Sequence, residues 1–348
     1  MRDSGIAAAL GAAVLFGLST PFAKALVASM PPLLLAGLMY AGSGLGLLAV
    51  MLVRTAIAGR RAITWPRGPD VLWLLGAIAF GGALGPYLLM VGLQGTDAAT
   101  ASLILNLEGV FTALLAWFVF KENFDRRIAF GMALIVGGGA VLSLGSTVRG
   151  GGVMAPLAIA GACLAWGIDN NLTRKVSLHD AMAVACIKGL VAGPISVALA
   201  LGAGEHLPPA IGAMEAGALG FVGYGLSLTL FVFALRNLGT ARTSAYFSLA
   251  PFIGAALAVA LGAPMTLPLL AAGSLMAIGI WLHLRERHGH LHRHDRLTHE
   301  HAHIHDLHHR HEHPPDWDGT EPHTHAHTHE PLVHEHPHYP DSHHRHEH

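Results

Sequence analysis

Charged residues are scarce in this chain. Asp, Glu, Lys and Arg make up 12% of its 348 residues, whereas hydrophobic residues make up 52%. A soluble helical protein would show a polar face on most of its helices, and the apolar runs here do not show one. The composition therefore argues against a soluble protein and favours a membrane protein.

Cysteine is nearly absent, and several functional motifs are missing. Cys163 and Cys186 both lie in apolar runs, which predicts buried thiols rather than a disulfide framework. The formal net charge is −1 and no basic stripe is present, so no nucleic-acid partner is expected. We find no nucleotide-binding loop and no nucleophile motif. We therefore expect neither enzyme activity nor a required cofactor.

Long apolar runs fill the chain up to residue 284. About 20 apolar residues in a helix cross the hydrocarbon core of a bilayer. Hydropathy predicts ten spans with short connections, at residues 5–27, 32–53, 70–93, 98–120, 126–146, 153–173, 181–202, 211–235, 240–262 and 265–284. The first run contains Pro21 and Lys24 and is followed by many more spans, so we expect it to be retained rather than cleaved as a signal peptide.

Basic residues predict the orientation in the lipid bilayer. If the N-terminus is cytoplasmic, the inner segments of the core hold fourteen basic residues, whereas the outer segments hold only Lys24 and Arg149. This is a strong positive-inside bias. It predicts a multi-pass protein of a bacterial-type inner membrane with both termini in the cytoplasm.

The apolar core is duplicated. The motif FGL…K at residues 16–24 returns as WGI…R at 166–174, and placing Thr100 on Thr243 brings Glu108 onto Pro251. Each half has an odd number of spans, so the halves must cross the bilayer in opposite orientations. We predict an all-α integral membrane fold of ten helices in two inverted five-helix repeats, residues 1–148 and 149–287, followed by a disordered tail, residues 288–348.

Three stretches resemble a known family: FGLSTPFAK at 16–24, TASLILNLEGVFTALLAWFVFKENF at 100–124 and TARTSAYFSLAPFIGAALAVAL at 240–261. In order and spacing they resemble the drug/metabolite transporter superfamily, in its ten-helix form with two EamA domains. The resemblance covers about residues 5–284 and implies a secondary carrier with a central cavity lined by both repeats. The chain departs from the family pattern at Glu108, where Pro is common, and at residues 263–265, where a Gly-Glu exit is common.

Three charged residues stand out within the predicted spans. Glu108 is the deepest, Asp169 lies towards the inner end of the sixth span, and Lys188 lies about two turns into the seventh. Charged groups in a bilayer face the bundle interior and tend to pair, so Lys188 is expected to neutralise either Glu108 or Asp169. Such a pair could be purely structural. Burial favours the protonated form of a carboxyl group, which makes Glu108 a candidate proton or cation acceptor.

Further candidates surround these charges. Asn170 and Asn171 follow Asp169, and Asn106 lies beside Glu108. Trp166 and Tyr246, with Phe247, are candidates for apolar or cation-binding walls, although large side chains in a bundle more often serve packing.

The last 61 residues differ from the rest, because all but three of the 26 histidines lie there, interleaved with Asp, Glu and Pro. No apolar periodicity supports a packed core. Neutral imidazole binds Ni, Co, Zn and Cu, so the tail is a predicted metal-binding segment. Membrane oxygenases also use histidine clusters, but hold them on helices. The metal candidates are His288, His290, His292, His294, His299, His301, His303, His305, His308, His309, His311, His313, His323, His325, His327 and His329.

Two functions follow from these features. The core predicts a secondary transporter that moves a small solute by alternating access, with proton-coupled efflux as the favoured mode. The tail leaves a divalent transition-metal transporter, or a metal-responsive membrane protein without transport, as alternatives. No histidine lies at mid-depth, which gives little support for a bare soft metal as cargo of the cavity. A homodimer is compatible with the sequence.

Overall fold

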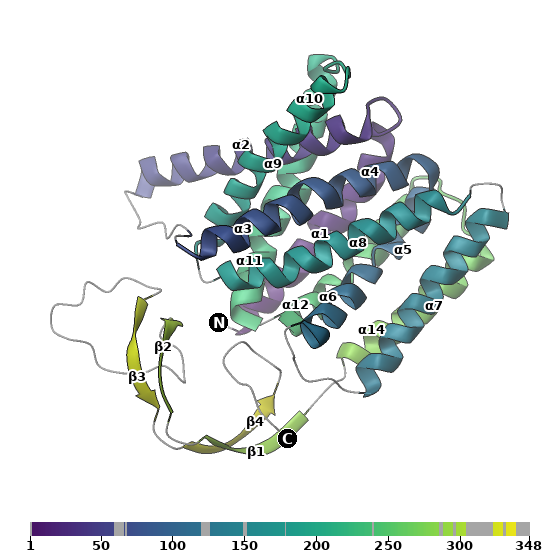
Figure 1. The fold of residues 1–348 in the computed structure, drawn as a ribbon. Helices are drawn as coiled ribbons and strands as arrows, with labels where there is room; N and C mark the ends of the chain where they lie inside the picture. Colours follow the sequence, from purple (N-terminus) through teal and green to yellow (C-terminus); the bar gives the residue numbers. More distant parts are fainter. Residues whose placement is uncertain are drawn as a thin grey trace.

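A computed structural model of the protein describes residues 2–58, 66, 68–119, 126–148, 152–177, 179–238, 240–284, 288–294, 297–303, 323–329 and 332–338. Within these residues the core is entirely helical (Figure 1). The first half consists of α1 (Arg2–Leu26), α2 (Pro32–Ala58), α3 (Asp70–Ala77), η1 (Ile78–Leu84), α4 (Gly85–Gly95), α5 (Ala98–Ile104), α6 (Leu107–Phe118) and α7 (Arg126–Val148).

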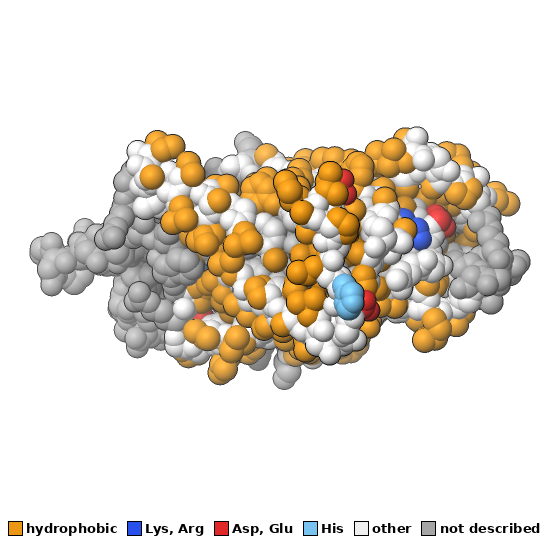
Figure 2. Space-filling model, turned by 90° about the horizontal axis from the view of Figure 1, so that it is seen from above, with side chains coloured by type: hydrophobic (Ala, Val, Ile, Leu, Met, Phe, Trp, Pro, Cys, Tyr) orange, Lys and Arg blue, Asp and Glu red, His pale blue; other side chains and the backbone are white. Residues whose placement is uncertain are grey.

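The second half repeats this order. It consists of α8 (Met154–Val176), α9 (Ala181–Gly202), α10 (Ala210–Gly220), η2 (Phe221–Leu226), α11 (Ser227–Leu238), α12 (Thr240–Phe247), α13 (Ala250–Ala260) and α14 (Leu267–Leu284). Successive pieces join into ten rods that match the ten predicted spans. Seven of the described rods are long and apolar enough to cross a membrane, and two shorter apolar helices cover 129–144 and 267–282. The surface in Figure 2 is correspondingly dominated by hydrophobic side chains. The protein is a multi-pass membrane protein.

The two halves break their helices at matching places. The third rod of each half contains a π-helical segment, η1 and η2. The fourth rods are interrupted at residues 105–106 and 248–249, which is the same position when Thr100 is placed on Thr243. Both interruptions are single tight turns, in which Glu108 N donates to Leu105 O at 3.0 Å and Phe252 N donates to Leu249 O at 3.1 Å. The sequence overlay is therefore confirmed in the backbone.

Packing follows the same two-fold relation. α2 packs against α9, and α7 against α14, so the second and fifth rods of each half meet their own counterparts. The contact of α6 with α8 corresponds to that of α13 with α1, and α4 with α8 corresponds to α11 with α1. The α7–α14 pair lies to one side of the other helices in Figure 1. This exchange of partners is the arrangement expected for inverted repeats around a shared central site.

The tail contains four short strands: β1 (His288–His294), β2 (Leu297–His303), β3 (His323–His329) and β4 (Leu332–His338). β1 pairs with β4 and β2 with β3, both antiparallel. These strands lie within the segment that the sequence predicts to be disordered. Histidine alternates with other residues in these segments, which is the period of a strand. An isolated two-stranded ladder is nevertheless only marginally stable in water. His305, His308, His309, His311 and His313 lie outside the described residues.

Candidate functional site

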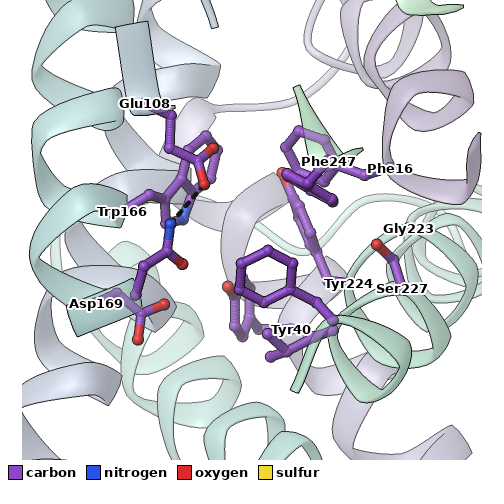
Figure 3. Close-up of a pocket in the computed structure, with 12 residues that line it drawn as sticks. Phe16, Tyr40, Glu108, Trp166, Asp169, Gly223, Tyr224, Ser227 and Phe247 are labelled. Atoms are coloured by element: carbon purple, nitrogen blue, oxygen red, sulfur yellow. Dashed lines mark hydrogen bonds between the residues drawn. The ribbon is translucent and has the colours of Figure 1, made fainter. Parts of the chain in front are cut away.

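A central cavity lies between the two repeats, with about 440 Å³ of space not filled by protein atoms. Figure 3 shows Glu108 and Asp169, with Trp166 between them, on one side of it and the rings of Phe16, Phe247 and Tyr224 on the other. Its lining comes from both halves of the chain: Phe16, Tyr40, Glu108, Trp166, Asp169, Asn170, Gly223, Tyr224, Ser227, Leu228, Phe231 and Phe247.

Glu108 stands in the first turn of α6, immediately after the helix interruption. The side-chain amide of Asn170 donates to Glu108 Oε1 at 2.8 Å, and also lies 3.2 Å from the hydroxyl of Thr112. The start of a helix stabilises a negative charge through the helix dipole. No ion pair to Glu108 occurs among the residues that the structure describes. The carboxyl group is therefore held in place by hydrogen bonding and remains without a counter-charge.

Lys188 pairs with Asp169, which decides between the two partners left open by the sequence. Lys188 Nζ lies 2.6 and 2.7 Å from the two carboxylate oxygens, and the Thr173 hydroxyl donates to Oδ1 at 2.8 Å. The side chains are 0% and 6% exposed. Asp169 is thus neutralised, and does not lie at a wet boundary.

The η1 segment anchors this ion pair. A Cβ on Gly81 would lie 1.8 Å from Asp169 Oδ2, so only glycine allows the carboxylate to pack there. The Gly81 carbonyl accepts from the Tyr40 hydroxyl at 2.6 Å and from Trp166 Nε1 at 3.1 Å. π-helical turns often mark functional sites. Here the η1 carbonyl orients two of the rings that line the cavity.

The other repeat has the same contact without the charge. A Cβ on Gly223 in η2 would lie 2.6 Å from Ser19 Cβ, just as Gly81 faces Asp169. Ser19 and Asp169 are equivalent when the motifs at 16–24 and 166–174 are overlaid. The buried ion pair therefore belongs to one half of the pseudo-symmetric site only.

The aromatic side chains form a continuous wall around Phe16. Its ring centroid lies 5.6 Å from Trp166, 5.4 Å from Phe247 and 5.9 Å from Tyr224. Tyr224 continues to Tyr40 at 5.1 Å, and Phe247 continues to Phe231 at 4.9 Å. These spacings are those of favourable aromatic pairs.

Three predicted residues lie elsewhere. Asn106 lines a neighbouring side cavity and donates to Leu103 O at 3.1 Å. Asn171 packs α8 on α6 by donating to Thr112 O at 3.1 Å, and does not line the central cavity. Tyr246 packs in an apolar cluster that includes Ala8, Ala9, Ala234 and Leu238. The structure therefore brings Glu108, Asp169, Asn170 and Trp166 to the cavity, with Lys188 behind Asp169, and leaves Tyr246 outside the lining.

The side cavity lies between α6 of the first repeat and α12 of the second repeat. It is lined by residues from α6 and α12 and the adjoining helix breaks, and shares Phe16, Glu108, Asn170 and Phe247 with the central cavity. By the repeat symmetry the α6–α12 contact corresponds to the α5–α13 contact. The α5–α13 interface is closely packed, with a Cβ on Gly254 only 3.2 Å from Ser102 Cβ, whereas α6 and α12 are much less in contact. The α5–α13 contact is thus closed, whereas its symmetry counterpart, the α6–α12 contact, is open.

Most of the aromatic wall was not identified from the sequence. Phe16, Tyr40, Tyr224 and Phe231 are single aromatic residues in apolar runs, where nothing local distinguishes lining from packing. A signal did exist at Gly81-Gly82 and at Gly223, because glycine within a membrane helix marks close approach. Tyr224 directly follows one of these glycines.

Metal ligands are not gathered in the core. Among the side chains that the structure describes, no group of three His, Cys, Asp or Glu residues lies close enough to hold a metal ion. Cys163 and Cys186 are buried, free thiols on different helices.

Ten helical rods in two repeats around a polar cavity define a multi-pass membrane transporter fold. The family model described as "EamA-like transporter family" matches residues 3–144 and 153–285, once for each repeat. The chain belongs to this family, within the drug/metabolite transporter superfamily.

Curated relatives agree in length and class. An "Uncharacterized transporter" of Methanothermobacter thermautotrophicus is 26% identical over 299 residues, 80% of this chain and 85% of its own. A "Probable amino-acid metabolite efflux pump" of Salmonella typhimurium is 28% identical over 302 residues, 81% of this chain and 95% of its own. A crystal structure with 21% identity matches with a TM-score of 0.62, over 81% of this chain and 98% of that chain. That likeness supports the fold alone.

Proposed function

We propose that the protein is a secondary active exporter of a small solute in the inner membrane, driven by proton exchange through Glu108. Both termini are cytoplasmic in this proposal, in keeping with the positive-inside bias of the sequence. The Salmonella relative named an efflux pump supports the direction of transport.

The observation that carries the proposal is the position of Glu108. It borders both cavities, lies at a helix break, and has no counter-ion among the described residues, whereas Asp169 is neutralised by Lys188. A carboxyl group that must face an apolar bundle is costly unless it can take up a proton or a cation. Alternate occupation by a proton and a solute would couple their movements.

Alternating access is supported by the unequal packing of symmetry-related helix pairs. α5–α13 is closed and α6–α12 is parted. Exchange of these two arrangements would open the cavity to the opposite side without altering the repeats themselves. Glu108 and Pro251 lie at the two breaks about which such a change would occur.

Transport by inverted membrane vesicles tests this proposal. A pH-sensitive dye would report collapse of the proton gradient on addition of amines, amino acids, carboxylic acids, or Ni²⁺, Co²⁺ and Zn²⁺ salts. We expect at least one organic probe to collapse the gradient faster than it does in vesicles that lack the protein, and Glu108→Gln to abolish that difference. Glu205→Gln, in an exposed connection, is the matched control. A full proton-driven rate in Glu108→Gln would remove Glu108 from coupling.

A second function is favoured by the strand register of the tail. His290 pairs with His336 in the β1–β4 ladder, and His301 pairs with His325 in the β2–β3 ladder. Directly paired positions lie about 5 Å apart, a spacing that suits shared binding of Ni, Co, Zn or Cu. The tail would then store or sense metal for the carrier, or load a metal substrate.

Removal of the tail separates these roles. Cells lacking the protein would be complemented with the full chain or with a chain ending at Arg287 and grown with each metal. Tolerance that needs the tail supports sequestration or sensing by the tail. Tolerance that survives its removal makes the helical core responsible for the metal. Equal growth with and without the protein would contradict the metal function.

A further inference from the structure

We infer that the central cavity binds an organic monocation with an aromatic or other apolar body. We also infer that it binds such an amine more tightly than the amino acid that carries the same apolar group. This inference rests on the proposed function only in taking the cavity as the transport site. It names the chemical class of the substrate, which neither the family nor the relatives' names give for this chain.

The charge of the lining favours a cation. Among the lining residues that the structure describes, Glu108 and Asp169 are the charged side chains, and the charge of Asp169 is balanced by Lys188 Nζ at 2.6 Å. Within the described part of the chain, this lining includes no Lys, Arg or His. The lining thus carries one uncompensated negative charge when Glu108 is ionised. An ammonium group would compensate that charge.

The aromatic wall favours an apolar body next to that charge. Tyr40 and Trp166 both direct their polar hydrogens to the Gly81 carbonyl, which leaves their ring carbons for other contacts. Phe16 and Phe247, with centroids 5.4 Å apart, lie across the cavity from Glu108 in Figure 3. Aromatic faces attract cations within about 6 Å and pack well against other rings. The same wall therefore suits both parts of an arylalkylamine.

The hydrogen bonds of the lining disfavour a carboxylate. Four polar lining side chains already donate to protein acceptors: Asn170, Trp166, Tyr40 and Ser227. A substrate carboxylate would face Glu108 with little more than the Tyr224 hydroxyl as a donor. Burying an unpaired negative charge beside another is unfavourable. A zwitterionic amino acid would therefore bind more weakly than the corresponding amine.

Isothermal titration calorimetry on the full-length protein in lipid nanodiscs tests this selection. The probes share one ring and differ in charge: phenethylamine (cation), 2-phenylethanol (neutral), phenylalanine (zwitterion) and phenylacetate (anion). We expect phenethylamine to bind at least tenfold more tightly than each of the others. Comparable or tighter binding of phenylalanine or phenylacetate would overturn the inference, and so would equal binding of 2-phenylethanol. This comparison uses the unaltered protein and does not depend on a variant folding.

Variants then locate the site. Glu108→Gln should weaken phenethylamine binding at least tenfold and leave 2-phenylethanol binding within twofold. Phe247→Leu should weaken phenethylamine binding severalfold, and Glu205→Gln should not change it. Unchanged amine binding in Glu108→Gln would contradict the assignment of the charge.

The inference and the proposed function fail separately. Phenethylamine that binds to the protein but collapses the proton gradient no faster in vesicles that contain the protein than in vesicles that lack it would contradict proton-coupled export and support the cation site. Proton-coupled transport of phenylalanine without phenethylamine binding would support proton-coupled export and contradict the cation site.

Discussion

Replacement of Lys188 by methionine should strongly destabilise the protein. Lys188 is fully buried, and its ammonium group is the charge partner of Asp169. Methionine has a similar length and fills the same space, so the change removes the charge without leaving a large cavity. Asp169 would then be buried beside η1 without a counter-ion.

The size of the effect follows from the burial of the pair. Breaking a buried ion pair by removing one partner costs about 3–5 kcal/mol. At about 2–4 °C per kcal/mol for domains of roughly 150–250 residues, the melting temperature should fall by at least about 6 °C. The double variant Lys188→Met with Asp169→Asn removes both charges and keeps the volume. It should recover most of the loss, because replacing both partners of a buried pair is often close to neutral.

Thermal unfolding of the purified protein in detergent, followed by intrinsic tryptophan fluorescence, measures this difference. Glu205→Gln, in an exposed connection, controls for the loss of a charge elsewhere in the protein. Should the single variant melt like the native protein, or the double variant melt as low as the single one, the ion pair would not be a stabilising element of the fold.

Three further predictions follow from the packing. Gly81→Ala introduces a Cβ at 1.8 Å from the carboxylate behind it and should lower the melting temperature and transport, whereas Gly137→Ala, with nothing within 4 Å, should be neutral or stabilising by about 0.5–1 kcal/mol in the same thermal assay. Tyr40→Phe removes one donor to the η1 carbonyl and should cost about 1 kcal/mol by thermal unfolding; no change would show that this bond adds nothing. Ser102→Cys with Gly254→Cys, in a background without native cysteines, should cross-link on oxidation and stop vesicle transport until reduced. Continued transport by the cross-linked protein would contradict alternating access.

The fold could be predicted from the sequence because its determinants are local. The length of each apolar run defines a rod, and the alignment of Thr100 with Thr243 relates the two halves without reference to tertiary contacts. The breaks at residues 105–106 and 248–249 then coincide in the structure. Interruption within a rod was harder to predict, since Glu108 and Pro251 give different local signals at the same position.

The candidate site could be predicted only in part. Charged residues are rare in apolar spans, so Glu108, Asp169 and Lys188 were conspicuous, but the choice of partner for Lys188 depends on the rotation of α8 and α9 about their axes. The aromatic wall draws on rods from both repeats, and packing between distant segments selects which rings face inward. Tyr246 and Phe247 are adjacent aromatic candidates in the sequence, but Phe247 lines the cavity whereas Tyr246 packs in an apolar cluster.

The breaks in the fourth and ninth rods match, so the position of the negative charge depends on which of the two breaks carries the acidic residue. Glu108 and Pro251 both border the side cavity, from opposite repeats, on backbones of the same shape. Exchanging them, as Glu108→Pro with Pro251→Glu, would carry the carboxylate to the facing wall, and would also remove the Glu108 N–H that donates to Leu105 O in the first turn. A duplicated scaffold of this kind offers two equivalent positions for a single ionisable group, and in this chain the group lies at one of them.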